Sequence, residues 1–416
     1  MPKSTASLLL LLGALGACSF ICFFGVLMHL PFIIVLVFCV ISIYRSIKMM
    51  QQQLPEVTQP ATDKYFIRTI LLLAAFIIIA DKAAHFSEKW GGWDAWSIWN
   101  LHARFLNISD FSQITHPAMS GNHSDYPLML PGIVALLSKL ANREMYYVPF
   151  AIACLFMYLS MTLVFSEIVQ KNLLAGLMVL LAFAFNDYFI VQGVQQYADT
   201  VLACFFTATM ICLYHYEQTQ KSIFLSAACF FVLCAVWTKN EGIVFALWVV
   251  VFYFREVFRK KNLAGVSIMA VAPLILIVIF KLVYATPNDL AEQQDFLLGE
   301  RLTNWHSYQL IWDYFRKNMD ERFLGLWVAA GLYVVSIFFN KRFYNKKVVV
   351  LLLTLISCQA PYLITPYNLE WHLDTSQDRL ILQVFSPFIY VFSTGIADMY
   401  NRQQELLRKR RAVHMA

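Results

Sequence analysis

Residues 145–166 read MYYVPFAIACLFMYLSMTLVFS, a stretch that contains no charged side chain. An α-helix needs about 20 consecutive apolar residues to cross the hydrocarbon core of a bilayer. A comparable stretch, SLLLLLGALGACSFICFFGVLM, covers residues 7–28. Segments of this length and composition predict helices that span a membrane.

The composition of the whole chain agrees with these two stretches. Of its 416 residues, 59% are hydrophobic and only 14% are charged, whereas soluble domains contain about 25% charged residues. The 9 cysteines all lie in apolar stretches, and the net charge of +6 is not concentrated in one basic domain. The sequence therefore predicts an all-α polytopic membrane protein and excludes a soluble domain, a disulfide scaffold and a nucleic-acid-binding module.

The apolar stretches predict a bundle of about twelve transmembrane helices. They lie near residues 7–28, 31–46, 66–81, 145–166, 172–191, 198–215, 222–238, 242–257, 263–284, 321–340, 347–366 and 380–400. The segment 127–141 is shorter and contains two prolines, so we expect it to be an interfacial or re-entrant helix.

Basic residues indicate the orientation of the chain. If 127–141 does not cross and both termini are cytoplasmic, most Lys and Arg residues lie on the inner side, as the positive-inside rule requires. A full crossing would place the basic C-terminus outside, so the first topology is favoured. The expected divisions are a transmembrane hairpin (1–46), a cytoplasmic linker (47–65), the main transmembrane domain (66–400) with outer loops 82–126 and 285–320, and a basic cytoplasmic tail (401–416).

The N-terminal hairpin has one alternative interpretation, a lipoprotein signal cleaved before Cys18. A cleaved signal should open onto a polar mature chain. A second apolar run follows Cys18 at once, so a retained hairpin is favoured.

Ionisable and aromatic side chains collect on the predicted outer side. An ionisable group at the hydrocarbon boundary is costly unless it is paired or faces a wet cavity, so we expect a shared polar pocket there. Any one of these residues taken alone is more often a solvated helix cap or an anchor at the interface. The candidate residues of this pocket are Trp93, Asp94, His123, Asp125, Asp199, Lys239, Glu241, His372 and Arg379.

Four tryptophans, Trp90, Trp93, Trp96 and Trp99, recur at every third position. The favoured interpretation is a belt of aromatic anchors at the membrane interface. The alternative is that one or two of these rings stack on a sugar while Asp94 contacts its hydroxyl groups.

No metal site is predicted, because His116, His123 and Asp125 lack the spacing of a fixed metal-binding motif. The chain also lacks a glycine loop that could cradle the phosphates of a nucleotide cofactor. The remaining alternative is a transient divalent cation between Asp94 and a substrate phosphate, because both groups offer hard oxygen ligands.

Five short motifs follow one another on the predicted outer side: GGWDAW at 91–96, HSDYPL at 123–128, YAD at 197–199, TKNEG at 238–242 and WHLDTSQDR at 371–379. Together, over about residues 66–380, they resemble bacterial GT-C glycosyltransferases, a superfamily that includes protein O-mannosyltransferases and lipid A aminoarabinose transferases. The resemblance implies a GT-C-like catalytic bundle over 66–400.

The resemblance also implies an activity. The chain is similar to enzymes that take a sugar from a polyprenyl phosphate at the extracytoplasmic face of the bacterial inner membrane. This similarity maps the catalytic residue onto Asp94. It maps a second acidic residue onto Asp199 and a lysine onto Lys239. Ala95 and Tyr126 stand where relatives often have glutamate and proline, so the resemblance does not identify the sugar or the acceptor, which is a glycan, a lipid or a protein.

The residues themselves suit an inverting glycosyl transfer. Asp94 can accept the proton of an acceptor hydroxyl, while Lys239, His372 and Arg379 neutralise the departing phosphate. The alternative function is a transporter or flippase of lipid-linked saccharides, whose path should carry ionisable residues in the middle of the membrane. The predicted spans are nearly free of such residues, so the sequence favours the enzyme.

Overall fold

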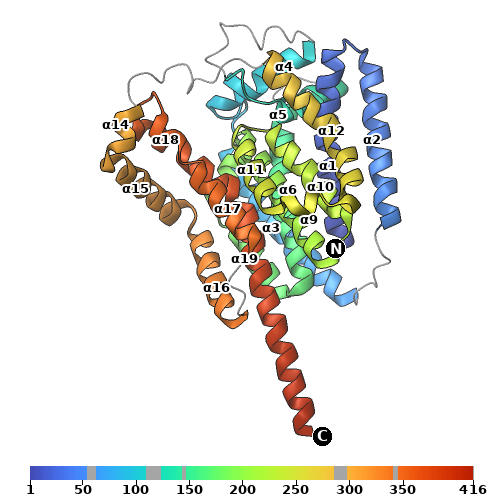
Figure 1. Ribbon diagram of the computed structural model, residues 1–416, viewed down its shortest axis with the longest axis vertical. Coiled ribbons are helices and arrows are strands. Elements are labelled where there is room, and N and C mark those ends of the chain that lie inside the picture. Colours follow the sequence, from blue (N-terminus) through green and yellow to red (C-terminus); the bar gives the residue numbers. More distant parts are fainter. Residues whose placement is uncertain (54–61, 109–122, 143–146, 285–297, 341–344, 416) are drawn as a thin grey trace.

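The computed structural model describes residues 1–53, 62–108, 123–142, 147–284, 298–340 and 345–415. Within these ranges every regular element is a helix (Figure 1). Two of them, η1 and η4, are π-helical turns. The elements are α1 (Lys3–Leu27), α2 (Phe32–Gln53), α3 (Thr62–Phe86), η1 (Ala95–Trp99), α4 (Asn100–Ile108), α5 (Met129–Ala141), α6 (Tyr147–Lys171), α7 (Leu173–Ala184), α8 (Asp187–Val194), α9 (Ala198–Thr219), α10 (Ser222–Val236), α11 (Glu241–Val257), α12 (Lys260–Ile279), η4 (Phe280–Tyr284), α14 (Leu298–Thr303), α15 (Trp305–Arg322), α16 (Leu324–Asn340), α17 (Lys346–Ser357), α18 (Pro361–Ile364) and α19 (Leu369–Met415).

Among the described residues, 6 helical segments are long and apolar enough to cross a membrane, or up to 8 if each of two bent helix pairs is one crossing. This agrees with an all-α, multi-pass membrane protein, but it does not reach the expected twelve spans. The predicted span 172–191 is bent by 61° between α7 and α8. The bend follows from Asn186, whose side chain accepts the backbone N–H of Phe189 and so caps a new helix.

The predicted span 321–340 also differs in the structure. The chain turns by 95° between α15 and α16, so the apolar helix begins only at Leu324. The preceding amphipathic segment α15 belongs to a separate arm beside the bundle (Figure 1).

Helix α9 forms the centre of the bundle and is almost wholly buried. Helices α6, α10 and α19 pack around it. Aromatic side chains fill the spaces around α9, as where Phe206 stacks on Phe245 of α11 with ring centroids 3.9 Å apart. The two ends of α9 carry Asp199 and Glu217, so this helix connects the two ends of the bundle.

The N-terminal hairpin is packed into this bundle. The indole of Trp237 stacks on Phe20 and donates to Ser19 Oγ at 3.2 Å. Helix α5 packs against α1, and its residues 129–136 are buried. It is therefore inserted among other helices, and its form as an interfacial or re-entrant helix stays a prediction.

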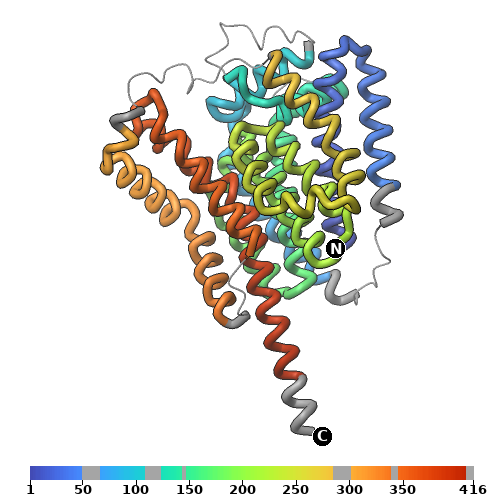
Figure 2. Tube along the Cα trace, in the orientation of Figure 1, coloured from blue at the N-terminus to red at the C-terminus, as the bar shows by residue number. Residues whose placement is uncertain are grey.

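The last helix, α19, has 47 residues and extends well beyond the bundle (Figure 2). The sequence predicts an outer turn over residues 370–379, before the span 380–400, and a separate tail after residue 400. The structure has one helix, because no glycine and no proline interrupts it before Pro387. Arg379 therefore lies on a helix, not in a turn.

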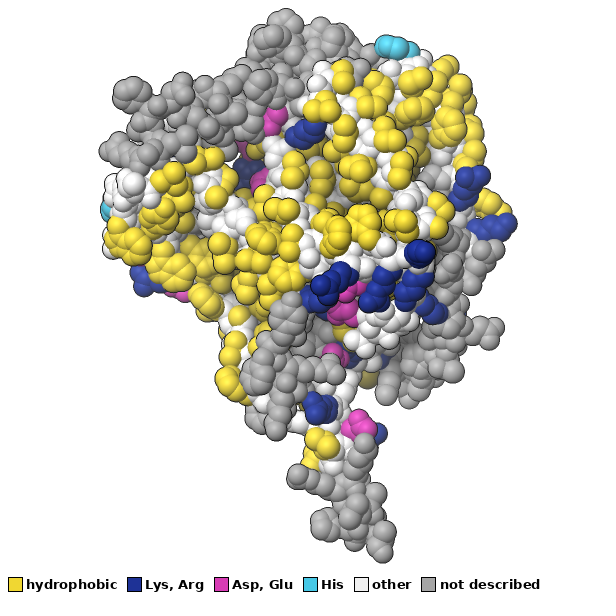
Figure 3. Space-filling model, viewed as in Figure 1, with side chains coloured by type: hydrophobic (Ala, Val, Ile, Leu, Met, Phe, Trp, Pro, Cys, Tyr) yellow, Lys and Arg dark blue, Asp and Glu magenta, His cyan; other side chains and the backbone are white. Residues whose placement is uncertain are grey.

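We call the two ends of the bundle the loop end and the terminal end. The loop end contains residues 87–94, residues 123–128 and the first residues of α9, α11 and α19 (Figure 1). The terminal end is the opposite end of the bundle, the one nearer to both chain termini (Figure 1). Hydrophobic side chains cover the middle of the molecule between them, and Lys and Arg side chains gather along the border of this apolar surface toward the terminal end (Figure 3).

Candidate active site

Two glycines hold the loop that carries Asp94 against the chain before α9. The N–H of Gly92 donates to the carbonyl of Gln195 at 3.1 Å. A Cβ on Gly92 would lie 2.2 Å from Tyr197 Oη, and Gly91 has a φ of +72°, which favours glycine. This close approach brings Asp94 next to the first turn of α9.

Asp199 is the centre of the site. Its carboxylate is fully buried, and both of its oxygens are occupied by donors. One oxygen accepts from Lys239 Nζ at 2.9 Å and from Gln383 Nε2 at 2.7 Å. The other accepts from Nε and Nη2 of Arg379, each at 3.0 Å. A buried carboxylate needs several hydrogen-bond donors and positive charges of this kind, because burial without partners strongly disfavours its charged form.

Arg379 connects Asp199 to Asp94. Its Nη1 lies 2.7 Å from Asp94 Oδ2, while its other nitrogens bind Asp199. The guanidinium carbon also lies 4.6 Å from the centroid of the Tyr197 ring. The planar guanidinium has enough donors for two carboxylates at once, which a lysine ammonium could not match in geometry.

Lys239 completes the cluster from the turn between α10 and α11. Its Nζ lies 2.9 Å from Glu241 Oε1, in addition to its contact with Asp199. Burial by itself would lower the pKa of Lys239, but the carboxylates of Asp199 and Glu241 raise it above its usual value. Lys239 is therefore charged. We call Asp94, Asp199, Lys239, Glu241 and Arg379 the charge cluster.

Asp125 and His123 lie beside the charge cluster. Asp125 Oδ2 accepts from Asn240 Nδ2 at 2.7 Å. The ring of His123 stacks on Tyr126, which in turn lies 5.9 Å from Lys239 Nζ. Both predicted residues thus contact direct neighbours of the cluster.

Lys281 belongs to the same surroundings and was not among the predicted site residues. It lies in the π-helical turn η4, and its Nζ donates to the carbonyl of Asp125 and to Asn240 Oδ1, at 2.7 and 2.6 Å. A second π-helical turn, η1, follows Asp94 directly. Such turns are frequent at functional sites because they redirect nearby side chains.

Gln383 was also not predicted, although a signal for it exists. It lies four residues after Arg379, so both occupy one face of α19. Ser386 continues this face and bonds Thr207 of α9 at 2.6 Å. Polar residues at helical spacing in an apolar segment could have indicated the face that α19 turns toward α9.

Two predicted residues lie away from the charge cluster. His372 precedes Arg379 by about 10 Å along the helix axis, and its Nδ1 lies 2.8 Å from Thr365 Oγ1. Trp93 is 67% exposed and packs edge-on against Trp96, with centroids 4.4 Å apart.

The four tryptophans do not share one environment. Trp90, Trp93 and Trp96 are exposed and line an open hollow of about 910 Å³ with Glu88 and Arg104. Trp99 is fully buried and stacks on Tyr126 at 5.3 Å. Trp99 therefore cannot belong to an interfacial belt, and the other three surround the loop that carries Asp94.

In the described part of the chain, no three His, Cys, Asp or Glu side chains converge as metal ligands. The transient cation between Asp94 and a substrate phosphate stays a prediction. Asp94 and Glu241 are the accessible acids of the cluster, with 24% and 20% of their side chains exposed, against 0% for Asp199.

Comparisons of this chain with protein-family models, with curated proteins and with solved structures found no match. The similarity to GT-C glycosyltransferases thus stays a prediction from the motifs.

Proposed function

We propose that this protein is an inverting glycosyltransferase of the GT-C type. It would move a sugar from a polyprenyl-phosphate donor to an acceptor at the extracytoplasmic face of a bacterial inner membrane. The observation that carries the proposal is the position of Asp94. This accessible carboxylate contacts a guanidinium that is itself fixed by a buried carboxylate, at the end of a bundle of apolar helices.

In the proposed reaction Asp94 acts as the general base. The acceptor oxygen attacks the anomeric carbon on the face opposite the phosphate, and its proton passes to Asp94. The bond between the anomeric carbon and the phosphate oxygen breaks, and the electron pair leaves with the polyprenyl phosphate. Attack from the opposite face inverts the configuration at this carbon.

Arg379 has two roles in this reaction. Without substrate it pairs with Asp94 at 2.7 Å. A donor phosphate that binds the guanidinium competes with Asp94 for the same donors, and so frees the carboxylate to accept a proton. Arg379 then stabilises the charge that develops on the leaving phosphate.

The distribution of charge supports the enzyme over the transporter or flippase. The middle of α9, residues 200–213, and the middle of α19, residues 380–397, contain no Asp, Glu, Lys, Arg or His. The Asp, Glu, Lys, Arg and His side chains of these two helices lie only toward their ends. A transport path for a charged headgroup would need such residues through the bilayer.

The test is the variant Asp94→Asn in purified protein reconstituted into lipid nanodiscs. The protein is given polyprenyl-phosphate-linked sugars one at a time, together with a cell-envelope extract that supplies the acceptor, and the release of free polyprenyl phosphate is measured. We expect release to fall about 10²–10⁴-fold, the usual contribution of a general base. Asp187→Asn is the matched control, because Asp187 is an exposed acid paired with Lys82 outside the charge cluster.

Unchanged release by Asp94→Asn would refute the assignment of Asp94. Movement of the intact donor between leaflets of a liposome, without release of polyprenyl phosphate, would instead favour the flippase.

A further inference from the structure

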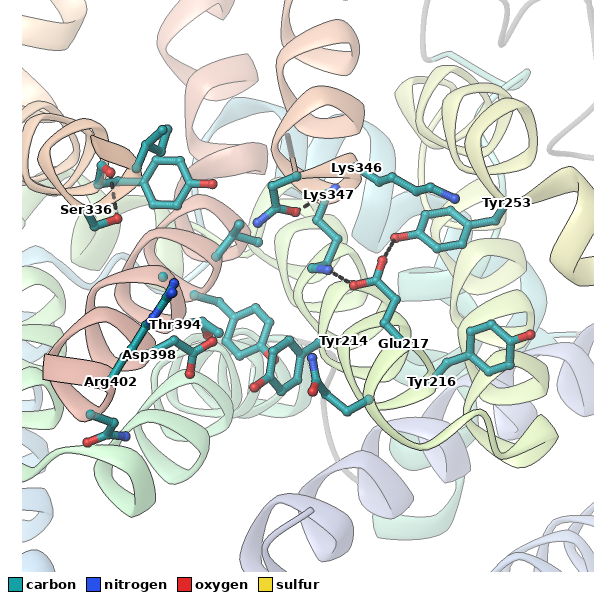
Figure 4. Close-up of a pocket in the computed structure, with 18 of the residues that line it drawn as sticks. Tyr214, Tyr216, Glu217, Tyr253, Ser336, Lys346, Lys347, Thr394, Asp398 and Arg402 are labelled. Carbon is teal, nitrogen blue, oxygen red and sulfur yellow. Dashed lines mark hydrogen bonds and ion pairs between the residues drawn. The ribbon is translucent and has the colours of Figure 1, made fainter. Parts of the chain in front are cut away.

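A second polar pocket lies at the terminal end of the bundle, at the other ends of the helices that carry the charge cluster (Figure 4). Its volume is about 950 Å³. Its walls are the last turns of α9, α11 and α16, the first turn of α17 and the middle of α19. The only aliphatic side chains among its lining residues are Ile337 and Val391. An apolar ligand therefore does not suit it.

Charged side chains of both signs line this terminal pocket in equal number. Lys347 is 6% exposed and forms an ion pair with Glu217, which also accepts from the hydroxyl of Tyr253 at 2.5 Å. Figure 4 shows Lys347 and Tyr253 both directed at Glu217, with Asp398 on the other wall. A ligand that fits this lining must offer hydrogen-bond donors as well as acceptors.

One wall of the terminal pocket favours an anion. Lys346 and Lys347 are the first two residues of α17, and Arg259 is a further lining cation. The positive end of the helix dipole adds to these charges. Phosphate oxygens are the acceptors that lysine side chains and helix N-termini commonly bind.

The opposite wall favours hydroxyl groups. Tyr390 and Thr394 of α19 line the pocket and are buried, and within the described ranges neither hydroxyl oxygen has a hydrogen-bond partner outside this pair. Such groups are costly unless a ligand or water satisfies them. The carboxylate of Asp398 lies one turn further along the same wall. Inorganic phosphate alone would not reach both walls of a pocket of this size.

The position of the pocket indicates how its ligand arrives. It lies at the end of the bundle where Lys and Arg side chains border the apolar surface (Figure 3). In a membrane this border is the level of the lipid phosphates. Lys and Arg side chains that line a pocket between transmembrane helices at this level are typical of lipid headgroup sites.

We propose that the terminal pocket binds the headgroup of an anionic phospholipid that carries hydroxyl groups next to its phosphate, as phosphatidylglycerol does. Lys346, Lys347 and Arg259 hold the phosphate, while Asp398, Tyr390 and Thr394 bind the hydroxyl groups. The same chemistry is present in a soluble glycerol phosphate, and the experiment separates the two sources.

The experiment measures binding to the full-length protein in a non-ionic detergent. The four probes are short-chain phosphatidylglycerol, short-chain phosphatidylcholine, glycerol 3-phosphate and inorganic phosphate. The test variant combines Lys346→Gln with Arg259→Gln. The matched control combines Lys260→Gln with Lys261→Gln, which removes the same charge from neighbouring residues that do not line the pocket.

We expect phosphatidylglycerol to bind the test variant about tenfold more weakly than the wild type and to bind the control unchanged. A third variant, Lys346→Arg with Arg259→Lys, should restore binding, which shows that charge and not folding was lost.

Two results would overturn the proposal. One is equal binding of phosphatidylglycerol to the test variant and the control, which would mean that binding depends on general surface charge and not on the pocket. The other is equal binding of inorganic phosphate and glycerol 3-phosphate, which would remove the role of the hydroxyl groups. If glycerol 3-phosphate binds and phosphatidylglycerol does not, the result would support a site for a phosphate next to hydroxyl groups and would assign it to a soluble ligand.

Discussion

The two ends of α9 carry ion pairs that are built differently. At the loop end one buried carboxylate, Asp199, is shared by Arg379, Lys239 and Gln383. At the terminal end three acids each have their own lysine, around a pocket of about 950 Å³. These pairs are Glu217 with Lys347, Glu256 with Lys346, and Asp398 with Lys171.

The difference decides what each end can do. A shared, buried carboxylate fixes several helices relative to one another and holds Arg379 in one orientation toward Asp94. Separate pairs at the edge of an open pocket leave donors and acceptors that a ligand can reach. The loop end is therefore suited to preorganised chemistry and the terminal end to reversible binding.

The largest expected effect is that of Asp199→Asn. The substitution keeps the shape of the side chain but removes the charge that Arg379 and Lys239 share, so we expect about 3–5 kcal/mol lower stability. Thermal unfolding in detergent measures the loss. Asp398→Asn is the matched change at the terminal end, and we expect under about 1 kcal/mol because Asp398 is 41% exposed. Equal effects at the two ends would remove the distinction between them.

Gly92→Ala should have the next largest effect. The added Cβ would lie 2.2 Å from Tyr197 Oη and 2.3 Å from Gln195 Oε1, so either these two side chains or the loop that carries Asp94 must shift. We expect about 1–3 kcal/mol lower stability and a loss of sugar transfer. Gly331→Ala in α16 is the control, since nothing lies within 4 Å of its added Cβ. Full transfer by Gly92→Ala would show that the position of this loop does not matter.

The smallest expected effect is that of Glu256→Gln at the terminal end. Its pair with Lys346, at 3.0 Å, is partly exposed, with 21% and 34% of the two side chains accessible. Pairs of this kind contribute under about 1 kcal/mol, and salt screens them further. Unfolding of the variant and the wild type should therefore differ little, and less at high salt. A loss as large as that of Asp199→Asn would mean that the terminal pairs also act as one network.

Residue order along the chain predicted much of the candidate site. Asp94, Asp199, Lys239 and Glu241 each follow or precede an apolar segment, and helix ends that meet at one membrane face bring such residues near one another. His372 was expected to lie beside Arg379, because the sequence predicts a turn over residues 370–379. The structure has a helix there, which separates His372 from Arg379 by about 10 Å along its axis.

The tryptophans show why spacing alone was insufficient. A regular three-residue repeat suggested one role for all four, but the π-helical turn η1 changes the direction of the last one. Trp99 then packs on Tyr126, a residue from another segment. A local repeat cannot predict the contact between Trp99 and Tyr126, because Tyr126 comes 27 residues later in the chain.

Composition and the spacing of apolar residues were enough to predict a helical chain, apolar segments long enough for a membrane, and charges mostly at helix ends. These properties depend on residues within a few helical turns of one another. Which charges share a partner depends instead on how the helices pack. Asp94, Asp199 and Arg379 are separated by long stretches of chain, and their pairing depends on distances between helices that no local spacing encodes.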